Sequence, residues 1–159
     1  MYARRVNFTV VDRAPARVAY LRYTGPFGEP LGRFWRSTVA PWLADHGLID
    51  CPRYGVAVDN PVTSTHDELR YDCCVELPPG LTLPDAEQTI LPGGRYAVAV
   101  YKGTGRDIGA AWMAFMREVD SRGLALDRSR APFEHYPRGA LFDHRTGVFS
   151  CELCAPVTA

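Results

Sequence analysis

The sequence has no excess of charge of either sign and almost no lysine. Its 159 residues include 18 basic and 18 acidic residues, and Lys102 is the one lysine among the basic residues. A chain without net charge offers no cationic field to a phosphate backbone, which argues against direct binding of nucleic acid. No apolar run approaches the roughly 20 residues that cross a membrane, and no signal-peptide core is present. We therefore expect a cytoplasmic protein with no membrane partner.

The commonest signatures of hydrolases, nucleotide-binding proteins and metalloproteases are missing as well. The sequence has no Gly-x-Ser-x-Gly, phosphate loop or His-Glu-x-x-His motif. Its five cysteines are an odd set without the spacing of a small secreted domain, which predicts free thiols. Cys151 and Cys154 are spaced like a redox or metal pair, but they fall in an expected strand, where residues three apart point to opposite faces. We predict no cofactor and no metal site.

The composition that remains is that of one globular domain, with 47% hydrophobic and 23% charged residues. Two alternating, strand-like runs, Arg17–Gly25 and Arg95–Gly103, both end in glycine. Each run precedes a pattern of apolar residues at helical spacing, so we expect helices around Leu31–His46 and Asp107–Arg122. Pro41 should bend the first of these helices, because proline removes one backbone hydrogen bond.

These similarities suggest an internal duplication. Gly25 and Gly103 lie 78 residues apart, and so do Pro78 and Pro156, which end a second pair of similar strands. We expect a single domain over 1–159, with repeat one at about 6–78 and repeat two at about 93–157. An additional strand near 7–12 is expected to pair with a strand in the linker 78–94.

The expected fold class is α+β. Two pseudo-symmetric βαββ repeats would form one antiparallel sheet, with two helices on one face and a ligand groove on the other. An aromatic sheet face without helices would suit an apolar ligand.

Four segments carry a resemblance to a known family. The sequence resembles the GyrI-like small-molecule-binding domain, which is also the effector-binding half of AraC-type and MerR-type multidrug regulators. The matching segments are Val18–Phe27 (VAYLRYTGPF), Asp59–Pro61 (DNP), Leu69–Val75 (LRYDCCV), and Gly93–Val98 (GGRYAV) followed by Ala111-Trp112 and Pro132–Tyr136 (PFEHY). One departure is Gly103-Thr104-Gly105, where the family often has a Gly-Pro-aromatic turn.

The resemblance implies a stand-alone protein that binds small amphipathic or cationic compounds, for sequestration or sensing, and not a transcription factor. It also leaves two alternatives open. The first is a hydrolase that opens cyclopropane-type DNA-alkylating compounds, so whether the chain is an enzyme is undecided at this point. The second is an inhibitor or modulator of DNA gyrase, with DNA gyrase or a separate regulator protein as the partner.

Glu134 is the most informative candidate residue, since the resemblance places it on the acidic residue of the family's drug pocket. In an aromatic pocket such a carboxylate would attract a lipophilic cation. The further ligand-binding candidates are Tyr20, Tyr71, Tyr136 and Phe149; Tyr71 and Phe149 occupy equivalent places in the two repeats. In the hydrolase alternative, Glu134 would be the general base and Tyr71 a proton donor. Trp35 and Trp112 are interpreted as core residues that pack helix on sheet.

Overall fold

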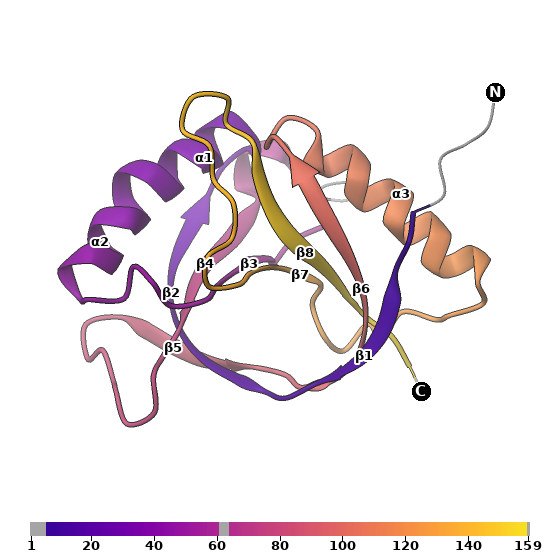
Figure 1. Cartoon of the computed structure of the whole chain (residues 1–159), viewed down its shortest axis with the longest axis horizontal. Helices are drawn as coiled ribbons and strands as arrows, with labels where there is room; N and C mark the ends of the chain where they lie inside the picture. Colours follow the sequence, from indigo (N-terminus) through magenta and orange to yellow (C-terminus); the bar gives the residue numbers. More distant parts are fainter. Residues whose placement is uncertain (1–5, 61–63, 159) are drawn as a thin grey trace.

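Eight antiparallel strands form one curled sheet in the part of the chain that the structure, a computed structural model, describes, namely residues 6–60 and 64–158 (Figure 1). The last residue of the expected Asp59–Pro61 turn lies outside these residues. The strands are β1 (Thr9–Arg13), β2 (Ala16–Thr24), β3 (Arg53–Ala57), β4 (Arg70–Glu76), β5 (Glu87–Leu91), β6 (Gly94–Gly103), β7 (Phe133–Tyr136) and β8 (Phe149–Pro156).

The strand order is β1-β6-β8-β7-β3-β4-β2-β5, so the short strands β7 and β3 meet at the centre of the sheet. Each half follows the expected order of strand, helix, strand and strand, with one added strand at each outer edge. A common origin of the halves by duplication stays a prediction. The expected pairing of the first strand with a strand in the linker is wrong, because β1 pairs with β6 and the linker strand β5 pairs with β2.

The first helical segment contains three parts: α1 (Glu29–Phe34), a π-helical turn η1 (Trp35–Val39) and α2 (Ala40–Asp45). Pro41 has no N–H to return to the carbonyl of Ser37, so the usual α-helical bond is missing there. The chain responds with a wider turn, in which the N–H of Ala40 bonds to the carbonyl of Trp35. The distortion expected at Pro41 is therefore present as a π turn just before it.

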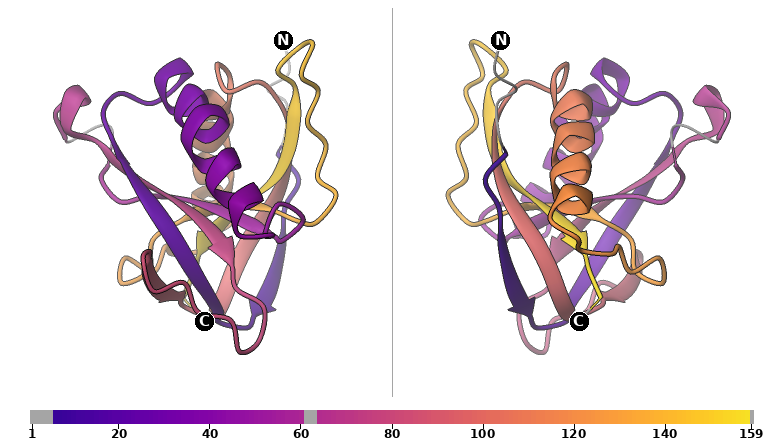
Figure 2. Two further views of the ribbon diagram at one scale, coloured as in Figure 1. Left: turned by 90° about the vertical axis from the view of Figure 1, so that its left-hand side faces the viewer. Right: turned by 90° about the vertical axis from the view of Figure 1, so that its right-hand side faces the viewer.

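The second helix, α3 (Ile108–Ser121), is regular and lies on the same face of the sheet as the first, as the sequence predicts. Figure 2 shows both helical segments between the two arms of the curled sheet. Val39 and Leu43 pack on the β2–β4 half, and Phe115 and Val119 pack on the β6–β8 half. None of the helices in the described ranges is long and apolar enough to span a membrane.

The other face of the sheet has a core of its own. Its largest members include Tyr54, Tyr96 and Phe133. Cys154 belongs to this core, whereas Cys151 belongs to the core under α3, so the expectation that they point to opposite faces is confirmed.

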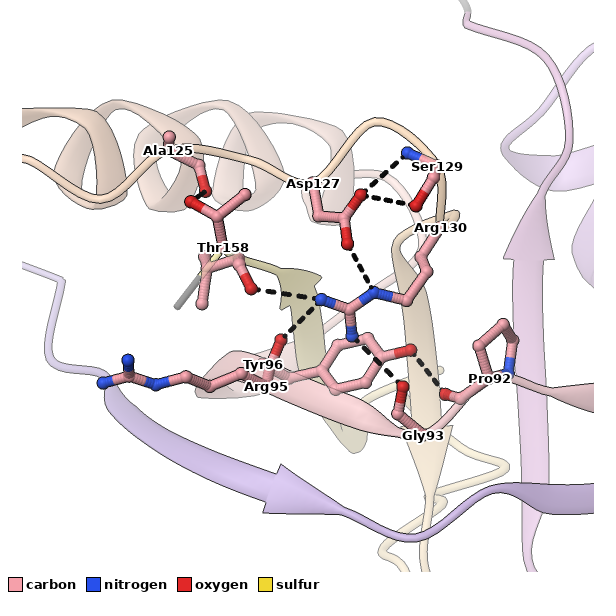
Figure 3. A network of polar contacts seen from close by, with 10 residues as sticks. Pro92, Gly93, Arg95, Tyr96, Ala125, Asp127, Ser129, Arg130 and Thr158 are labelled. Atoms are coloured by element: carbon pink, nitrogen blue, oxygen red, sulfur yellow. Dashed lines mark hydrogen bonds and ion pairs between the residues drawn. The ribbon is translucent and has the colours of Figure 1, made fainter.

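Arg130 connects the end of β8 to the start of β6 through hydrogen bonds (Figure 3). Its guanidinium donates to the carbonyl oxygens of Gly93, Arg95 and Val157 at 3.4, 3.2 and 3.1 Å, and it pairs with Asp127 at 2.9 Å. Hydrogen bonds from Ser129, followed by the bond from Arg130, lower the pKa of Asp127 to about 2. These contacts add to the β6–β8 ladder, and the same guanidinium lies over the buried ring of Tyr96, 4.7 Å from its centroid.

Candidate functional site

Glu134 lies at the centre of the sheet, on β7, and its side chain points to the face that carries the helices. In the register of the strands it stands between Leu153 of β8 and Gly55 of β3. Trp112 of α3 contacts it from the helix layer. The site is therefore bounded by both halves of the sheet and by a helix.

Three neutral donors surround the carboxylate. The Tyr71 hydroxyl donates to Oε1 at 2.6 Å, and the Tyr136 hydroxyl donates to the same oxygen at 3.2 Å. The indole Nε1–H of Trp112 donates to Oε2 at 2.8 Å. No arginine, lysine or histidine forms an ion pair with Glu134 among residues 6–60 and 64–158. The negative charge is thus held by hydrogen bonds alone.

The pKa values at the site follow from the burial of Glu134 and from its three hydrogen-bond donors. Desolvation raises the pKa of Glu134, and the three hydrogen bonds act in the opposite direction without cancelling it. Part of the Glu134 residue surface nevertheless remains accessible. Burial, and then the charge of Glu134, raise the pKa values of Tyr71 and Tyr136 well above their ordinary range. Both phenols therefore stay protonated and act as donors at neutral pH.

Gly55 makes the shortest of these hydrogen bonds possible. A Cβ atom at Gly55 would overlap the hydroxyl of Tyr71 and lie 2.5 Å from its ring carbon Cζ. It would also stand 3.1 Å from Oε1 of Glu134. The absent side chain leaves the space through which Tyr71 reaches the carboxylate.

Aromatic rings extend the site on both sides. Trp35, the first residue of the π turn, packs against Tyr136 with ring centroids 5.9 Å apart and against Tyr71 at 6.4 Å. Phe27 meets Tyr71 at 5.6 Å, and Phe149 meets Tyr136 at 6.0 Å. We call this set, together with Trp112, the aromatic cluster. It gives the carboxylate walls that suit flat or apolar groups.

The structure brings four of the five sequence candidates together. Tyr71 and Tyr136 bond directly to Glu134, and Phe149 joins through its contact with Tyr136. Tyr20 does not belong to the group, because it packs with the core of the opposite face. The equivalence expected for Tyr71 and Phe149 holds for the sheet face they share but not for direct contact with the carboxylate.

The face on which the candidate residues lie needs a correction. The sequence led us to expect the ligand residues on the face without helices, yet Trp112 reaches Glu134 from α3. Alternation along a strand shows which residues share a face, but it does not show which face the helices cover. The face without helices does carry a cavity, but Glu134 points away from it.

Sequence reasoning missed four residues of the site: Phe27, Trp35, Trp112 and Gly55. The two tryptophans lie at helical spacing among apolar residues, which favoured a core interpretation. One signal was available, because a buried indole N–H usually has an acceptor and an acidic residue is a natural one. Gly55 gave no signal, since its role depends on the register between β3 and β4.

Comparison with known proteins gives the family. The model of the GyrI-like small molecule binding domain matches residues 7–158. A protein from Cronobacter sakazakii named DNA gyrase inhibitor is 26% identical over 156 residues, which cover 96% of this chain and 97% of that protein.

Two solved structures share the fold. The C-terminal domain of EcmrR has a TM-score of 0.70 at 12% identity, over 96% of this chain and 98% of that one. The structure of SAV2435 bound to tetraphenylphosphonium has a TM-score of 0.56 at 12% identity, over 96% of this chain and 94% of that one. With the family model matched over nearly the whole length, this chain belongs to the GyrI-like small molecule binding domains.

Proposed function

We propose that this protein binds lipophilic organic cations at Glu134. The observation that carries the proposal is a desolvated carboxylate with three neutral donors, a wall of aromatic rings and no ion-pair partner among the described residues. Such a group is unfavourable while it is charged and unpaired, because desolvation acts against the ionised form. A cationic ligand would supply the missing positive charge.

The hydrogen bonds also favour one kind of cation. Oε1 already accepts from Tyr71 and Tyr136, and Oε2 accepts from Trp112. A cation without N–H donors does not compete for these positions and can lie against the ring faces instead. Each cation–π contact contributes about 0.5–2 kcal/mol. Quaternary ammonium and phosphonium ions have this chemistry, and the SAV2435 structure, which shares only the fold, holds such an ion.

The test compares two ligands of similar shape, methyltriphenylphosphonium and the uncharged triphenylphosphine oxide. Quenching of tryptophan fluorescence measures both, because Trp35 and Trp112 lie in the aromatic cluster. We expect Glu134→Gln to weaken the phosphonium by about 5- to 150-fold and to leave the oxide unchanged.

The control variant is Glu87→Gln, an exposed carboxylate on the edge strand β5. It should not change the affinity for either ligand. Equal affinity of the unmodified protein for phosphonium and oxide would contradict cation capture. The same conclusion would follow if Glu134→Gln and Glu87→Gln had equal effects.

Hydrolysis of cyclopropane-type alkylating compounds is the second candidate, favoured by the 2.6 Å hydrogen bond between Tyr71 and Glu134. A raised pKa brings Glu134 closer to the range of an effective general base. The pKa of Tyr71 is raised too, however, which makes this phenol a weaker acid and places binding ahead of catalysis. If the protein is a hydrolase, Glu134→Gln should lower turnover by about 10²–10⁴-fold while substrate binding persists.

A protein partner is the third candidate, suggested by the relative named DNA gyrase inhibitor. A pull-down with purified gyrase, followed by a supercoiling assay, separates this activity from the other two. Glu134→Gln should leave gyrase binding intact, because the carboxylate points into the molecule.

A further inference from the structure

A cavity of about 490 Å³ lies on the face of the sheet opposite Glu134. The segment that joins β1 to β2 borders it and runs along the lower side of the view in Figure 1. Its floor includes Tyr54, Glu76, Val98 and Glu152, from four different strands. This volume is within the usual range for small-molecule sites, about 300–1,000 Å³.

A pair of flat rings lies between two carboxylates at this cavity. Tyr54 and His135 stand opposite each other on β3 and β7, and their rings stack with centroids 4.9 Å apart and an interplanar angle of 21°. Nδ1 of His135 lies 2.6 Å from Oε1 of Glu152, and the Tyr54 hydroxyl donates to Oε1 of Glu76 at 2.6 Å. The two carboxylates are thus held in place by rigid neighbours.

These bonds use one oxygen of each carboxylate. Within the described ranges, no hydrogen bond or ion pair engages Oε2 of Glu76 or Oε2 of Glu152. Two positioned acceptor atoms in the lining of the cavity are therefore left for a ligand.

The charges of the lining residues determine the sign of the charge that a ligand should carry. The lining contains the carboxylates of Glu76 and Glu152, and Arg13 is its one basic residue within the described part of the chain. Asp12 also borders the cavity, but its side chain alternates with that of Arg13 along β1 and lies on the same face as Val10, under α3. Arg13 forms a long ion pair with Glu152, 3.8 Å from Nη1 to Oε1, and its guanidinium lies over the ring of Phe133, 5.6 Å from the centroid. Within the described ranges Glu76 has no ion pair, so the two carboxylates together outnumber the one arginine. Val11 and Val98 add apolar surface for a short carbon chain.

We propose that this cavity is a second ligand site, selective for small amines that carry N–H donors, with Glu76 and Glu152 as the acceptors. Its chemistry complements that of the Glu134 site. There, the carboxylate oxygens already accept hydrogen bonds and aromatic rings provide the walls. Here, acceptor oxygens face a cavity with few ring faces, so donor-bearing cations such as short diamines fit better than quaternary ions.

Calorimetric titration with 1,4-diaminobutane tests the proposal. The matched ligand is its hexamethylated derivative, 1,4-bis(trimethylammonio)butane, which has the same charge and no N–H. We expect saturable binding of the diamine and much weaker binding of the quaternary compound. Glu76→Gln and Glu152→Gln should each weaken the diamine by about 5- to 150-fold. Glu134→Gln should leave diamine binding unchanged, so this test and the phosphonium test can fail separately.

Arg13→Gln provides a variant whose predicted effect a folding defect cannot imitate. It removes the positive charge of the lining, so diamine affinity should increase by about 1.5- to 5-fold. Three results would overturn the proposal: no saturable diamine binding at millimolar concentrations, equal affinity for both ligands, or weaker binding after Arg13→Gln. Loss of diamine binding in Glu134→Gln would instead place the amine at the first site.

Discussion

Substitution of Gly55 by alanine tests whether the carboxylate site depends on close packing between β3 and Tyr71. The added Cβ would overlap the Tyr71 hydroxyl, so the ring has to move and its 2.6 Å bond to Glu134 is lost. Overpacking typically costs about 1–3 kcal/mol. Loss of a hydrogen bond to a charged group costs about 1.5–3 kcal/mol, with the lower end appropriate because Glu134 is partly accessible.

The expected total is a loss of about 2–4 kcal/mol in the free energy of unfolding. A small compensation of about 0.4–1 kcal/mol, from the less flexible unfolded chain, is included in this figure. Urea denaturation followed by tryptophan fluorescence measures the change. Gly109→Ala is the matched control, because Gly109 lies in α3 with open space around it. This substitution should raise the free energy of unfolding by about 0.5–1 kcal/mol.

A double-mutant cycle decides whether the cause is Tyr71. Tyr71→Leu keeps an apolar side chain but removes the hydroxyl and Cζ, the two nearest atoms to the new Cβ. In that background Gly55→Ala should cost less than about 0.5 kcal/mol, so the two sites should couple strongly. The reasoning is refuted if Gly55→Ala is harmless alone, or if its cost is the same with leucine at position 71.

Local patterns in the sequence were enough to predict the strands, the helices and the face that the helices share. The partner of β1 could not be predicted in the same way. Only Ala14 and Pro15 separate β1 from β2, which suggests a hairpin by length. However, two-residue hairpins favour turns such as Asn-Gly, whereas proline holds the residue before it extended. The chain therefore passes from the edge strand β1 to β2, which lies next to the strand at the opposite edge, and β1 pairs with β6.

The candidate site was predictable in its charged centre and less so in its surroundings. Glu134 and Tyr136 are two residues apart on one strand, which requires a common face. The contacts of Trp112 and Tyr71 with Glu134 join segments 22 and 63 residues away, and they depend on strand register and on the position of α3. Only the assembled fold contains that information.

Two further tests concern stability. Arg130→Ala should lower the free energy of unfolding by about 1–3 kcal/mol, because three hydrogen bonds to carbonyl oxygens and the ion pair with Asp127 are lost. The control is Arg128→Ala, at an exposed neighbouring position, which should change the free energy of unfolding little. Glu134→Gln should change stability in a pH-dependent way. The folded-state pKa of Glu134 is raised, so its contribution is present below the unfolded value of about 4.5 and is lost as pH rises through the folded pKa. Glutamine cannot ionise and avoids this loss, although it has its own cost in rearranging the three donors. That cost is independent of pH, so only the change of the stability difference with pH is diagnostic. Urea denaturation from pH 4 to pH 8 measures it. The stability of Glu134→Gln relative to the unmodified protein should rise with pH by about 1.4 kcal/mol for each unit by which folding raises the pKa of Glu134. A difference that stays constant over this range would mean that desolvation does not raise the pKa of Glu134, and it would remove the electrostatic basis for cation capture.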